Sequence, residues 1–477
     1  MVVLVSAVAV GGAVLAGAPG AGAALIAPGA VPAAGTWGTA IEVPGLAALN
    51  ANGRAEVLSV SCGLAGDCAA GGSYQDRNHR LQGFVASEQD GTWGGATGVP
   101  GLARLNAGGT AEVLSVSCGP AGNCAAGGYY YGRRSQQAFV DSEQNGTWTK
   151  AIGVPKLAAL NAGFAEVLSV SCGPAGGCAA GGYYYDRRGQ QGFVVSEHNG
   201  TWGGVIRVPG LAALNADGSA EVSSVSCYGP EGNCTAGGYY EDRHRHHQGF
   251  VASEHNGTWG KAIGIRGLGA LNAGGQAAAT TVSCASAGNC AAGGSYKDSH
   301  AHPQGFVVSQ QHGVWGKAIE VPGLASLESG GAMALSVSCS SAGNCVAAGS
   351  YKDHNGRGQG FVASEQDGTW SRATAVPGLA ALNAGGSARV LSVSCGTAGN
   401  CAAGGSYLDS QQDQQGFVVS EQDGTWSRAT VVPGLAALNA GAAQVLSVSC
   451  DPAGNCAAGG YYQDFQRKTQ GLVVSQS

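Results

Sequence analysis

The sequence predicts an all-β protein, an eight-bladed β-propeller of four-stranded antiparallel blades. Its eight tryptophans recur at intervals from 54 residues (148 to 202) to 57 residues (202 to 259), and such a period is typical of repeat architectures. Each repeat holds four short strand-like runs and no helix long enough to connect parallel strands, which is the pattern of a propeller blade. The tryptophans are Trp37, Trp93, Trp148, Trp202, Trp259, Trp315, Trp370 and Trp426.

The repeat that starts at Trp37 shows these elements in order. Its strand-like runs are rich in β-branched and small residues, and its linker is too short and glycine-bounded for more than one helical turn. Asx-Gly between two apolar runs is a strong hairpin signal. The expected elements are strands at 37–44, 56–62, 68–74 and 83–88, a linker at 45–53 and a turn at Asp90-Gly91.

The two ends of the chain are complementary half-repeats. The last repeat stops at residues 472–477, where a tryptophan strand should follow, and the first repeat begins with such a strand. We expect these two strands to pair and close the ring, because closure removes the exposed edges of an open array. An open β-solenoid is the alternative, and it would need no complementary ends.

The cysteines form one close pair in each repeat. Seven pairs have five residues between them and the fourth pair has six, and each pair brackets an expected tight turn. The two sulfurs of a pair would then lie opposite one another on neighbouring strands, within reach of a disulfide. We count these cysteines among the candidate site residues, as the disulfides Cys62/Cys68, Cys118/Cys124, Cys172/Cys178, Cys227/Cys234, Cys284/Cys290, Cys339/Cys345, Cys395/Cys401 and Cys450/Cys456.

Zinc binding is the alternative reading of these pairs. Zinc sites usually have two to four residues between paired ligands and need two pairs that converge on one ion. Here each pair sits alone in its repeat, with no histidine at a fixed offset. We therefore predict no metal site and no cofactor.

The N-terminal segment indicates secretion. Residues 2–26 carry no charge and are nearly all valine, alanine, leucine and glycine, and Ala21, Ala23 and Ala24 are candidate cleavage-site residues. We interpret residues 1–34 as a signal peptide with a linker and residues 35–477 as the propeller, in an oxidising extracellular compartment. The segment lacks the basic residues that normally begin a signal peptide, which suggests that the true start codon lies upstream. The alternative to a cleaved signal peptide is an anchor helix that the mature protein retains.

Composition excludes a nucleic-acid partner. Only 11% of the residues are charged and the net charge is −6, so the chain has no basic field that would attract a polyanion along its whole surface. We expect a monomer without a membrane span once the signal peptide is removed.

The repeats resemble those of secreted bacterial β-propeller proteins, in which each blade carries a Ser-Val-Ser-Cys strand and a returning Cys-Ala-x-Gly strand. Residues 59–62 with 68–71, and 392–395 with 401–404, carry the resemblance, which extends over residues 37–477. The turn at residues 87–93 also resembles the Asp-box of sialidase-type propellers, with one residue of difference in spacing. The resemblance implies the architecture and no activity.

Residues that recur in every repeat are expected to serve the fold. A tryptophan in each blade is what packing between blades needs. Glu56, Glu112, Glu166 and Glu221 occupy one position of the expected innermost strand, where the other repeats have Ala278, Met333, Arg389 and Gln444. Half of the channel wall would therefore be acidic, which suits either a water-lined wall or a cation site.

The loop between the second and third strands is where the repeats differ most. It collects much of the small stock of arginine and histidine of this acidic chain, and binding residues are often carried by such loops. The histidines His244, His246 and His247 are able to chelate a metal, although a solvated loop tip is the simpler reading. The candidate ligand-binding residues are Arg77, Arg80, Arg133, Arg134, Arg187, Arg188, Arg243 and Arg245.

Two functions remain open at this stage. One is a secreted binding module for an extracellular polysaccharide, cell-envelope polymer or protein, and the other is a glycan-acting hydrolase or lyase on a propeller scaffold. The sequence has no nucleophile elbow, no zinc-protease motif and no phosphate-binding loop, so we name no catalytic residue. Near-identical blades favour the binding module.

Overall fold

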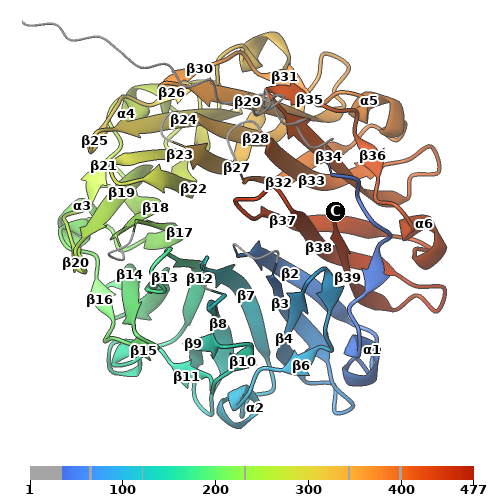
Figure 1. Ribbon diagram of the computed structural model, residues 1–477. Helices are drawn as coiled ribbons and strands as arrows, with labels where there is room; N and C mark the ends of the chain where they lie inside the picture. Colours follow the sequence, from blue (N-terminus) through green and yellow to red (C-terminus); the bar gives the residue numbers. More distant parts are fainter. Residues whose placement is uncertain are drawn as a thin grey trace, which may run out of the picture. The chain divides into compact units, whose positions relative to one another are not determined.

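Eight antiparallel sheets stand around a common axis in the computed structural model (Figure 1). They belong to one compact unit, residues 34–477. The structure describes residues 35–476 except 64–66, 121, 230–232, 342–343 and 397–399, so the expected signal segment 1–34 lies outside the described residues. The predicted eight-bladed propeller is confirmed.

One blade shows the strand order of all. In the first blade the innermost strand β2 (Ala55–Cys62) pairs with β3 (Cys68–Gln75), and β3 pairs with β4 (Leu81–Gln89). The outermost strand is interrupted, because β5 (Thr92–Trp93) and β6 (Thr97–Gly98) both pair with β4. The sequence predicted a single continuous strand at this position.

The other blades repeat this order from the inside outwards. Their innermost strands are β7 (Ala111–Cys118), β12 (Ala165–Cys172), β17 (Ala220–Tyr228), β22 (Ala277–Ser286), β27 (Ala332–Ser341), β32 (Ala388–Cys395) and β37 (Ala443–Cys450). The second strands are β8 (Cys124–Tyr131), β13 (Cys178–Asp186), β18 (Asn233–Glu241), β23 (Asn289–Lys297), β28 (Asn344–Lys352), β33 (Asn400–Leu408) and β38 (Cys456–Gln463). The third strands are β9 (Gln136–Gln144), β14 (Gly189–His198), β19 (His247–His255), β24 (Pro303–Gln311), β29 (Gly358–Gln366), β34 (Gln414–Gln422) and β39 (Thr469–Ser475).

The outermost strands are short pairs of segments in seven blades. They are β5 with β6, β10 (Thr147–Trp148) with β11 (Ile152–Gly153), β15 (Thr201–Trp202) with β16 (Ile206–Arg207), β20 (Thr258–Trp259) with β21 (Ile263–Gly264), β25 (Val314–Trp315) with β26 (Ile319–Glu320), β30 (Thr369–Trp370) with β31 (Thr374–Ala375), and β35 (Thr425–Trp426) with β36 (Thr430–Val431). Each begins after a tight turn such as Asp90-Gly91, where both residues have positive φ (49° and 75°), as a type I′ hairpin requires.

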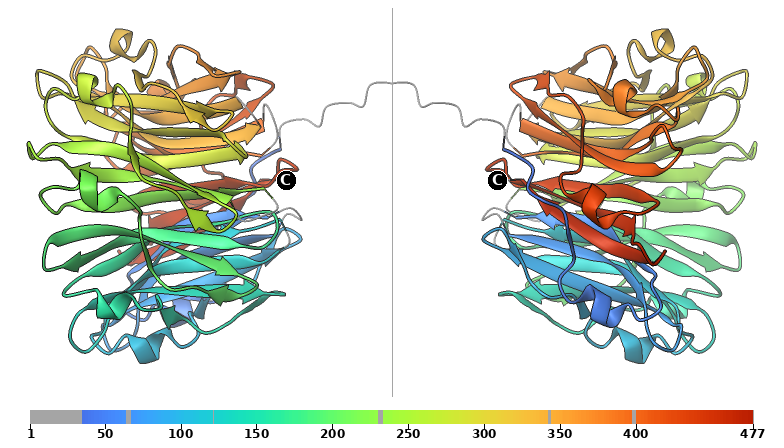
Figure 2. Two further views of the ribbon diagram at one scale, coloured as in Figure 1. Left: turned by 90° about the vertical axis from the view of Figure 1, so that its left-hand side faces the viewer. Right: turned by 90° about the vertical axis from the view of Figure 1, so that its right-hand side faces the viewer.

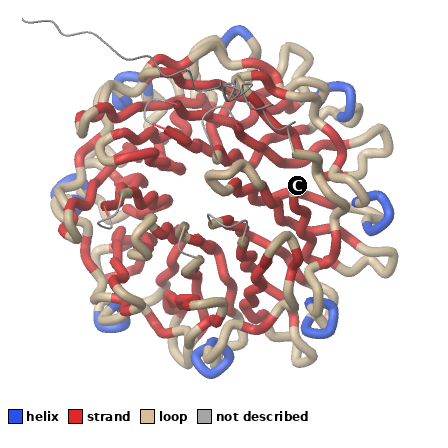
Figure 3. Tube along the Cα trace, viewed as in Figure 1, coloured by secondary structure: helices blue, strands red, loops and turns tan. Residues whose placement is uncertain are grey.

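A single helical turn at the rim starts the linker to each following innermost strand (Figure 3). Its first leucine, such as Leu46, is buried. An asparagine follows this turn in seven repeats and reaches the preceding blade, as where Asn106 Nδ2 donates to Leu81 O at 3.0 Å. The turns are α1 (Leu46–Leu49), α2 (Leu102–Leu105), η1 (Leu157–Ala159), α3 (Leu211–Leu214), α4 (Leu268–Leu271), η2 (Leu324–Ser326), α5 (Leu379–Leu382) and α6 (Leu435–Leu438).

The N-terminal strand closes the ring. β1 (Ile41–Glu42) pairs antiparallel with β39 and completes the eighth blade as its outermost strand, with Ile41 opposite Val473. A further bridge joins Trp37 to Gln476. The predicted closure by complementary ends is confirmed.

In seven blades the second strand contains a Gly-Gly pair, and each of its two glycines has its own physical reason. A Cβ on Gly71 would lie 2.6 Å from Cγ1 atoms of Val113 and Val116, which project from the next blade. A Cβ on Gly72 would lie 1.9 Å from Glu56 O, because a bulge in β2 brings this carbonyl close. The first glycine therefore lets neighbouring blades approach, and the second accommodates the bulge.

Serine hydroxyls join the innermost strands of neighbouring blades. The innermost strand is an edge strand, so alternate N–H groups along it lack a partner within its own sheet. Ser59 Oγ accepts the N–H of Val116 at 3.0 Å, and Ser61 Oγ accepts that of Cys118 at 2.9 Å. The same two bonds recur at every junction around the ring.

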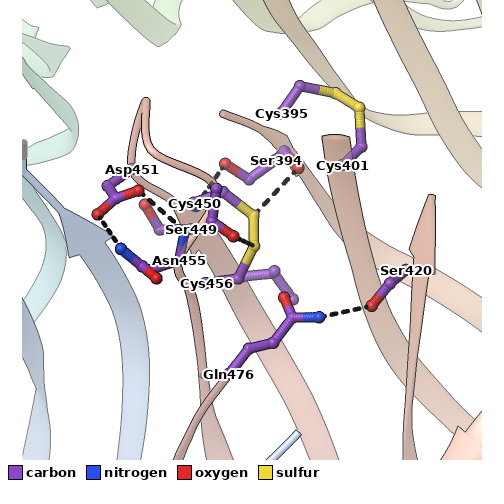
Figure 4. Close-up of a disulfide and its surroundings, with 12 residues drawn as sticks. Ser394, Cys395, Cys401, Ser420, Ser449, Cys450, Asp451, Asn455, Cys456 and Gln476 are labelled. Carbon is purple, nitrogen blue, oxygen red and sulfur yellow. Dashed lines mark hydrogen bonds between the residues drawn. A yellow bond between two sulfur atoms is a disulfide. The ribbon is translucent and has the colours of Figure 1, made fainter. Parts of the chain in front are cut away.

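All sixteen cysteines form the eight predicted disulfides within their own blades. Each bridge closes the turn between the first and second strands. Figure 4 shows Cys450 bonded to Cys456, beside the turn that Asp451 and Asn455 hold together. By the chain-entropy estimate each such small ring contributes roughly 2 kcal/mol. Among the described residues, no helix is long and apolar enough to span a bilayer.

Two of these cysteines, Cys234 and Cys290, are core residues although they flank a turn. Each is only 2% exposed, whereas their disulfide partners are half-buried. Cys234 packs in the apolar core of the fourth blade, and Cys290 packs in the core cluster that includes buried Tyr228, the extra residue of the fourth repeat. The predicted pairs Cys227/Cys234 and Cys284/Cys290 are confirmed, and the second cysteine of each pair is also part of the core.

Removing residues 37–44 should lower the free energy of unfolding by roughly 5 kcal/mol, because buried Val43 and Ala40 and half-buried Trp37 lose their contacts with the eighth blade. Thermal unfolding followed by circular dichroism measures the change. Ile41→Ala is the control, since this side chain is 40% exposed and β1 stays in place. An unchanged melting temperature after the deletion would contradict closure by β1.

Replacing Ser115 and Ser117 together by alanine should lower the free energy of unfolding by about 2–4 kcal/mol, because the N–H groups of Val170 and Cys172 lose their acceptors. Denaturant unfolding measures this loss. Ser115→Thr should be well tolerated, since Thr281 accepts the equivalent bond in the fifth blade. If the double variant were as stable as the parent, these bonds would not hold the blades together.

Candidate functional site

The eight arginines singled out in the sequence lie in the loops between the second and third strands of the first four blades, and all eight are exposed. The linkers between blades lie beside the same ends of the second and third strands. For example, Leu81 N donates to Gly109 O of a linker, and Gly108 N of that linker donates to Tyr131 O. We call this side of the ring the arginine face. The disulfides lie at the opposite ends of the strands, and Figure 2 shows the blades edge-on between the two faces.

An aspartate organises most of these loops. Asp76 Oδ1 accepts the N–H groups of Asn78 at 2.8 Å and Arg80 at 3.0 Å, while Oδ2 accepts from Gln82 Nε2. Burial works to raise the pKa of Asp76, but these hydrogen bonds and the Arg80 charge outweigh it and hold the pKa below its usual value. Equivalent contacts are made by Asp242, Asp298, Asp353, Asp409 and Asp464.

The arginine side chains are largely uncommitted. Arg245 Nε lies 3.3 Å from Asp217 Oδ2, and within the described ranges none of the other seven forms an ion pair. The aliphatic part of Arg80 also packs against the chain, because its Cγ lies beside Gly109 of the next linker. These guanidinium groups are therefore largely unpaired, while Asp76, Asp186 and Asp242 hold the loops of the first, third and fourth blades.

A cluster of aromatic rings lies on the same face, in the second to fourth blades. The ring centroid of Tyr185 is 6.2 Å from that of Phe164 and 5.9 Å from that of Tyr183, both edge-to-face. Phe164 is 49% exposed and Tyr185 is 38% exposed. We define the aromatic cluster as Tyr129, Tyr131, Phe164, Tyr183, Tyr185, Tyr239 and His247.

Carboxylates and glutamines tie the cluster together. Tyr129 Oη donates to Glu112 Oε1 at 2.9 Å, and Gln136 Nε2 donates to Glu166 Oε1 at 2.6 Å. Gln190 joins two blades, because its Oε1 accepts from Tyr185 and Tyr239 and its Nε2 donates to Glu221 Oε2.

Burial and nearby carboxylates keep the tyrosines protonated. Burial, aided by Glu221, raises the pKa of Tyr239 to about 12. Burial also raises the pKa of Tyr129 and Tyr183, and in each case the hydrogen-bonded glutamate adds to the effect. These phenols therefore act as hydrogen-bond donors at neutral pH.

The structure answers several smaller expectations. Glu112, Glu166 and Glu221 face hydrogen-bonding partners, and no group of three His, Cys, Asp or Glu side chains among the described residues is placed to hold a metal ion. His247 stacks on Tyr239 with centroids 4.8 Å apart, whereas His244 and His246 remain at the exposed loop tip. The recurrent tryptophan does join neighbouring blades, as where Trp148 Nε1 donates to Ser87 Oγ.

Part of the aromatic cluster was not predicted from the sequence. Phe164 occupies a linker position where the other repeats have Arg54, Thr110, Ser219, Gln276, Gly331, Ser387 and Ala442. Tyr131 and Tyr185 occupy one position of the second strand where no other repeat is aromatic. Aligning the repeats column by column and marking aromatic residues confined to one or two blades would have found all three.

No protein-family model matches the chain, and no curated protein sequence does. Among solved structures, the chain is similar to Sqt1 from Chaetomium thermophilum, at 12% identity over 89% of this chain and 95% of that one, with a TM-score of 0.49. It is also similar to the Hadza microbial sialidase Hz136, at 10% identity over 83% of this chain and 73% of that one, with a TM-score of 0.40. A protein of unknown function from Dyadobacter fermentans matches at 10% identity over 94% of this chain and all of the other, with a TM-score of 0.40.

Proposed function

We propose that the protein is an extracellular binding module whose arginine face recognises an anionic glycan. Eight disulfides support an extracellular setting, because such bonds persist in oxidising compartments and every cysteine of the chain is used in one. Recognition is local to the arginine face, since the net charge of the whole chain is −6.

Arginine suits the anionic groups of such a ligand. Its planar guanidinium can donate two parallel hydrogen bonds to a carboxylate, sulfate or phosphate group. Successive blades present Arg133 and Arg134, then Arg187 and Arg188, on corresponding loops. A polymer with anions repeated along its length can therefore contact several blades at once, and the contribution of each contact adds to the next.

The aromatic cluster suits the sugar rings of the same ligand. The C–H groups on one face of a pyranose carry a slight positive charge and pack against the negative face of an aromatic ring. Phe164 and Tyr185 expose such surfaces, and tyrosine hydroxyls nearby donate hydrogen bonds. The observation that carries the proposal is this coincidence of exposed, mostly unpaired arginines and exposed aromatic rings on the same blades.

A glycan-acting hydrolase is a second candidate, because the Tyr129–Glu112 pair resembles a nucleophile beside a base. Two features favour binding instead. The pKa of Tyr129 is raised by burial and by Glu112, which opposes formation of a phenolate. The same arrangement recurs in the third blade with Tyr183 and Glu166, whereas an active site gathers unlike residues from different blades.

Exchanging the eight arginines of the arginine face for serine should abolish binding to an anionic polymer while the melting temperature stays nearly unchanged. Exposed loop side chains contribute little to stability, and their contacts with the polymer should also weaken as salt rises. Binding of heparin and of alginate by biolayer interferometry, at low and at physiological salt, measures both effects. Release of reducing ends in the same mixtures would favour the hydrolase.

Arg357→Ser with Arg467→Ser is the matched control, because these exposed arginines occupy the corresponding loops of the sixth and eighth blades. This variant should bind as the parent does. Phe164→Ala with Tyr185→Ala should weaken binding by roughly thirtyfold, through the loss of about 1 kcal/mol per stacked ring. A parent that binds no anionic polymer at low salt would overturn the proposal.

A further inference from the structure

The junction between the sixth and seventh blades contains a hollow on the face opposite the arginines. Its volume is about 850 Å³, whereas the corresponding hollow between the first and second blades measures about 220 Å³. Both lie beside disulfides, next to the turns between the third and outermost strands. The larger one is lined by residues of β28, β29 and β34 together with Cys395 and Cys401.

Two substitutions in the sixth repeat distinguish this junction from the others. The second strand of most blades reads Cys-Ala-Ala-Gly-Gly, but β28 reads Cys345-Val-Ala-Ala-Gly349. Val346 and Ala348 are both buried against the seventh blade, in one cluster with Val390 and Val393. These two larger side chains stand where most other blades have alanine and glycine, while the hydrogen bonds between the innermost strands keep their usual lengths, 3.1 Å from Val393 N to Ser336 Oγ and 2.9 Å from Cys395 N to Ser338 Oγ.

A contact that joins several other pairs of blades is missing at this junction. Between the first and second blades, Trp148 Nε1 donates to Ser87 Oγ, which donates to Glu143 Oε1 at 3.1 Å. At the sixth-to-seventh junction, Trp426 Nε1 and Glu421 Oε2 are buried and have no hydrogen-bond partner among the described residues. Glu421 is only 6% exposed and lines the hollow.

The lining is acidic and rich in hydroxyl groups. Glu365, Asp367, Glu421 and Asp423 contribute four carboxylates, and the described lining contains no lysine, arginine or histidine. Ser364, Thr369 and Ser371 add hydroxyls. A buried carboxylate oxygen without a partner costs free energy, and a cation that donates a hydrogen bond to it would remove that cost.

We propose that this hollow binds a small polar ligand through a primary ammonium group, which donates to Glu421 while the surrounding hydroxyls and carboxylates hold the rest of the molecule. Amino sugars with a free amine and short polyamines both carry such a primary ammonium group on a small polar molecule. The site is independent of the arginine face, so neither proposal depends on the other.

The ionisation of Glu421 supports this assignment. Burial, with a smaller contribution from Asp423, raises the pKa of Glu421 to about 7, and burial also raises the pKa of Glu365. An ammonium ion favours the charged carboxylate, so ligand affinity should be full above the pKa of Glu421 and decline as the pH falls through it. Asp367 and Asp423 are the other titratable groups that line the hollow.

Isothermal titration of the full chain with glucosamine and with putrescine at about pH 8, above the pKa of Glu421, tests the proposal. We expect at least one of the two amines to bind with a stoichiometry of one per chain. Binding of glucosamine indicates an amino sugar as the natural ligand, and binding of putrescine indicates a polyamine. N-acetylglucosamine, which lacks the ammonium group, should not bind. Glu421→Gln should weaken binding by about tenfold or more, because it removes the charge and keeps the shape.

A matched variant makes the result specific to this junction. Glu143→Gln, at the corresponding position of the junction between the first and second blades, should leave affinity unchanged. The proposal is overturned if neither amine binds, if N-acetylglucosamine binds as tightly, if calcium binds in place of the amines, or if Glu421→Gln and Glu143→Gln have equal effects.

Discussion

The hydroxyl bonds between innermost strands constrain most of the repeat. Edge N–H groups near a channel need partners, and Ser59 and Ser61 supply them to Val116 and Cys118 of the next blade. These bonds form where blades approach closely, and at the first junction Gly71 faces Val113 and Val116, which the bulge turns toward it. The serines, valines and glycines of each repeat therefore depend on one another, and a change in any one of them affects a junction.

Because the junctions are so uniform, the few exceptions are informative. The sixth repeat departs from the common pattern at Val346 and Ala348, and the hollow and the unpartnered oxygen of Glu421 occur at that junction. Phe164 and Tyr185 depart from it on the other face, and they are exposed there. Residues shared by all blades form the junctions that hold the ring together. Residues found in only one or two blades make one part of the surface different from the rest.

Much of the fold could be predicted because it depends on short-range patterns. The tryptophan period, the Asp90-Gly91 turn and the spacing of Cys62 and Cys68 each concern residues close together in the chain, and the complementary ends indicated closure. The sites were harder to predict because they depend on which side of a strand faces a neighbour. Val346 stands out in an aligned repeat, but its effect follows only from the strand register that directs it toward the seventh blade. The interruption of the outermost strands after each tryptophan had no signal that we recognised.

Closure by β1 has a consequence for how the ring assembles. A contact between adjacent blades closes a chain segment of one repeat, whereas pairing Ile41 with Val473 closes nearly the whole chain. Loop-closure entropy makes the latter about 2 kcal/mol less favourable, and of the described strands β1 is made first and β39 last. β1 therefore stays without its partner until β39 has been made. We expect the ring to form as an open arc whose ends join in a final step, and thermal opening to begin at the same seam.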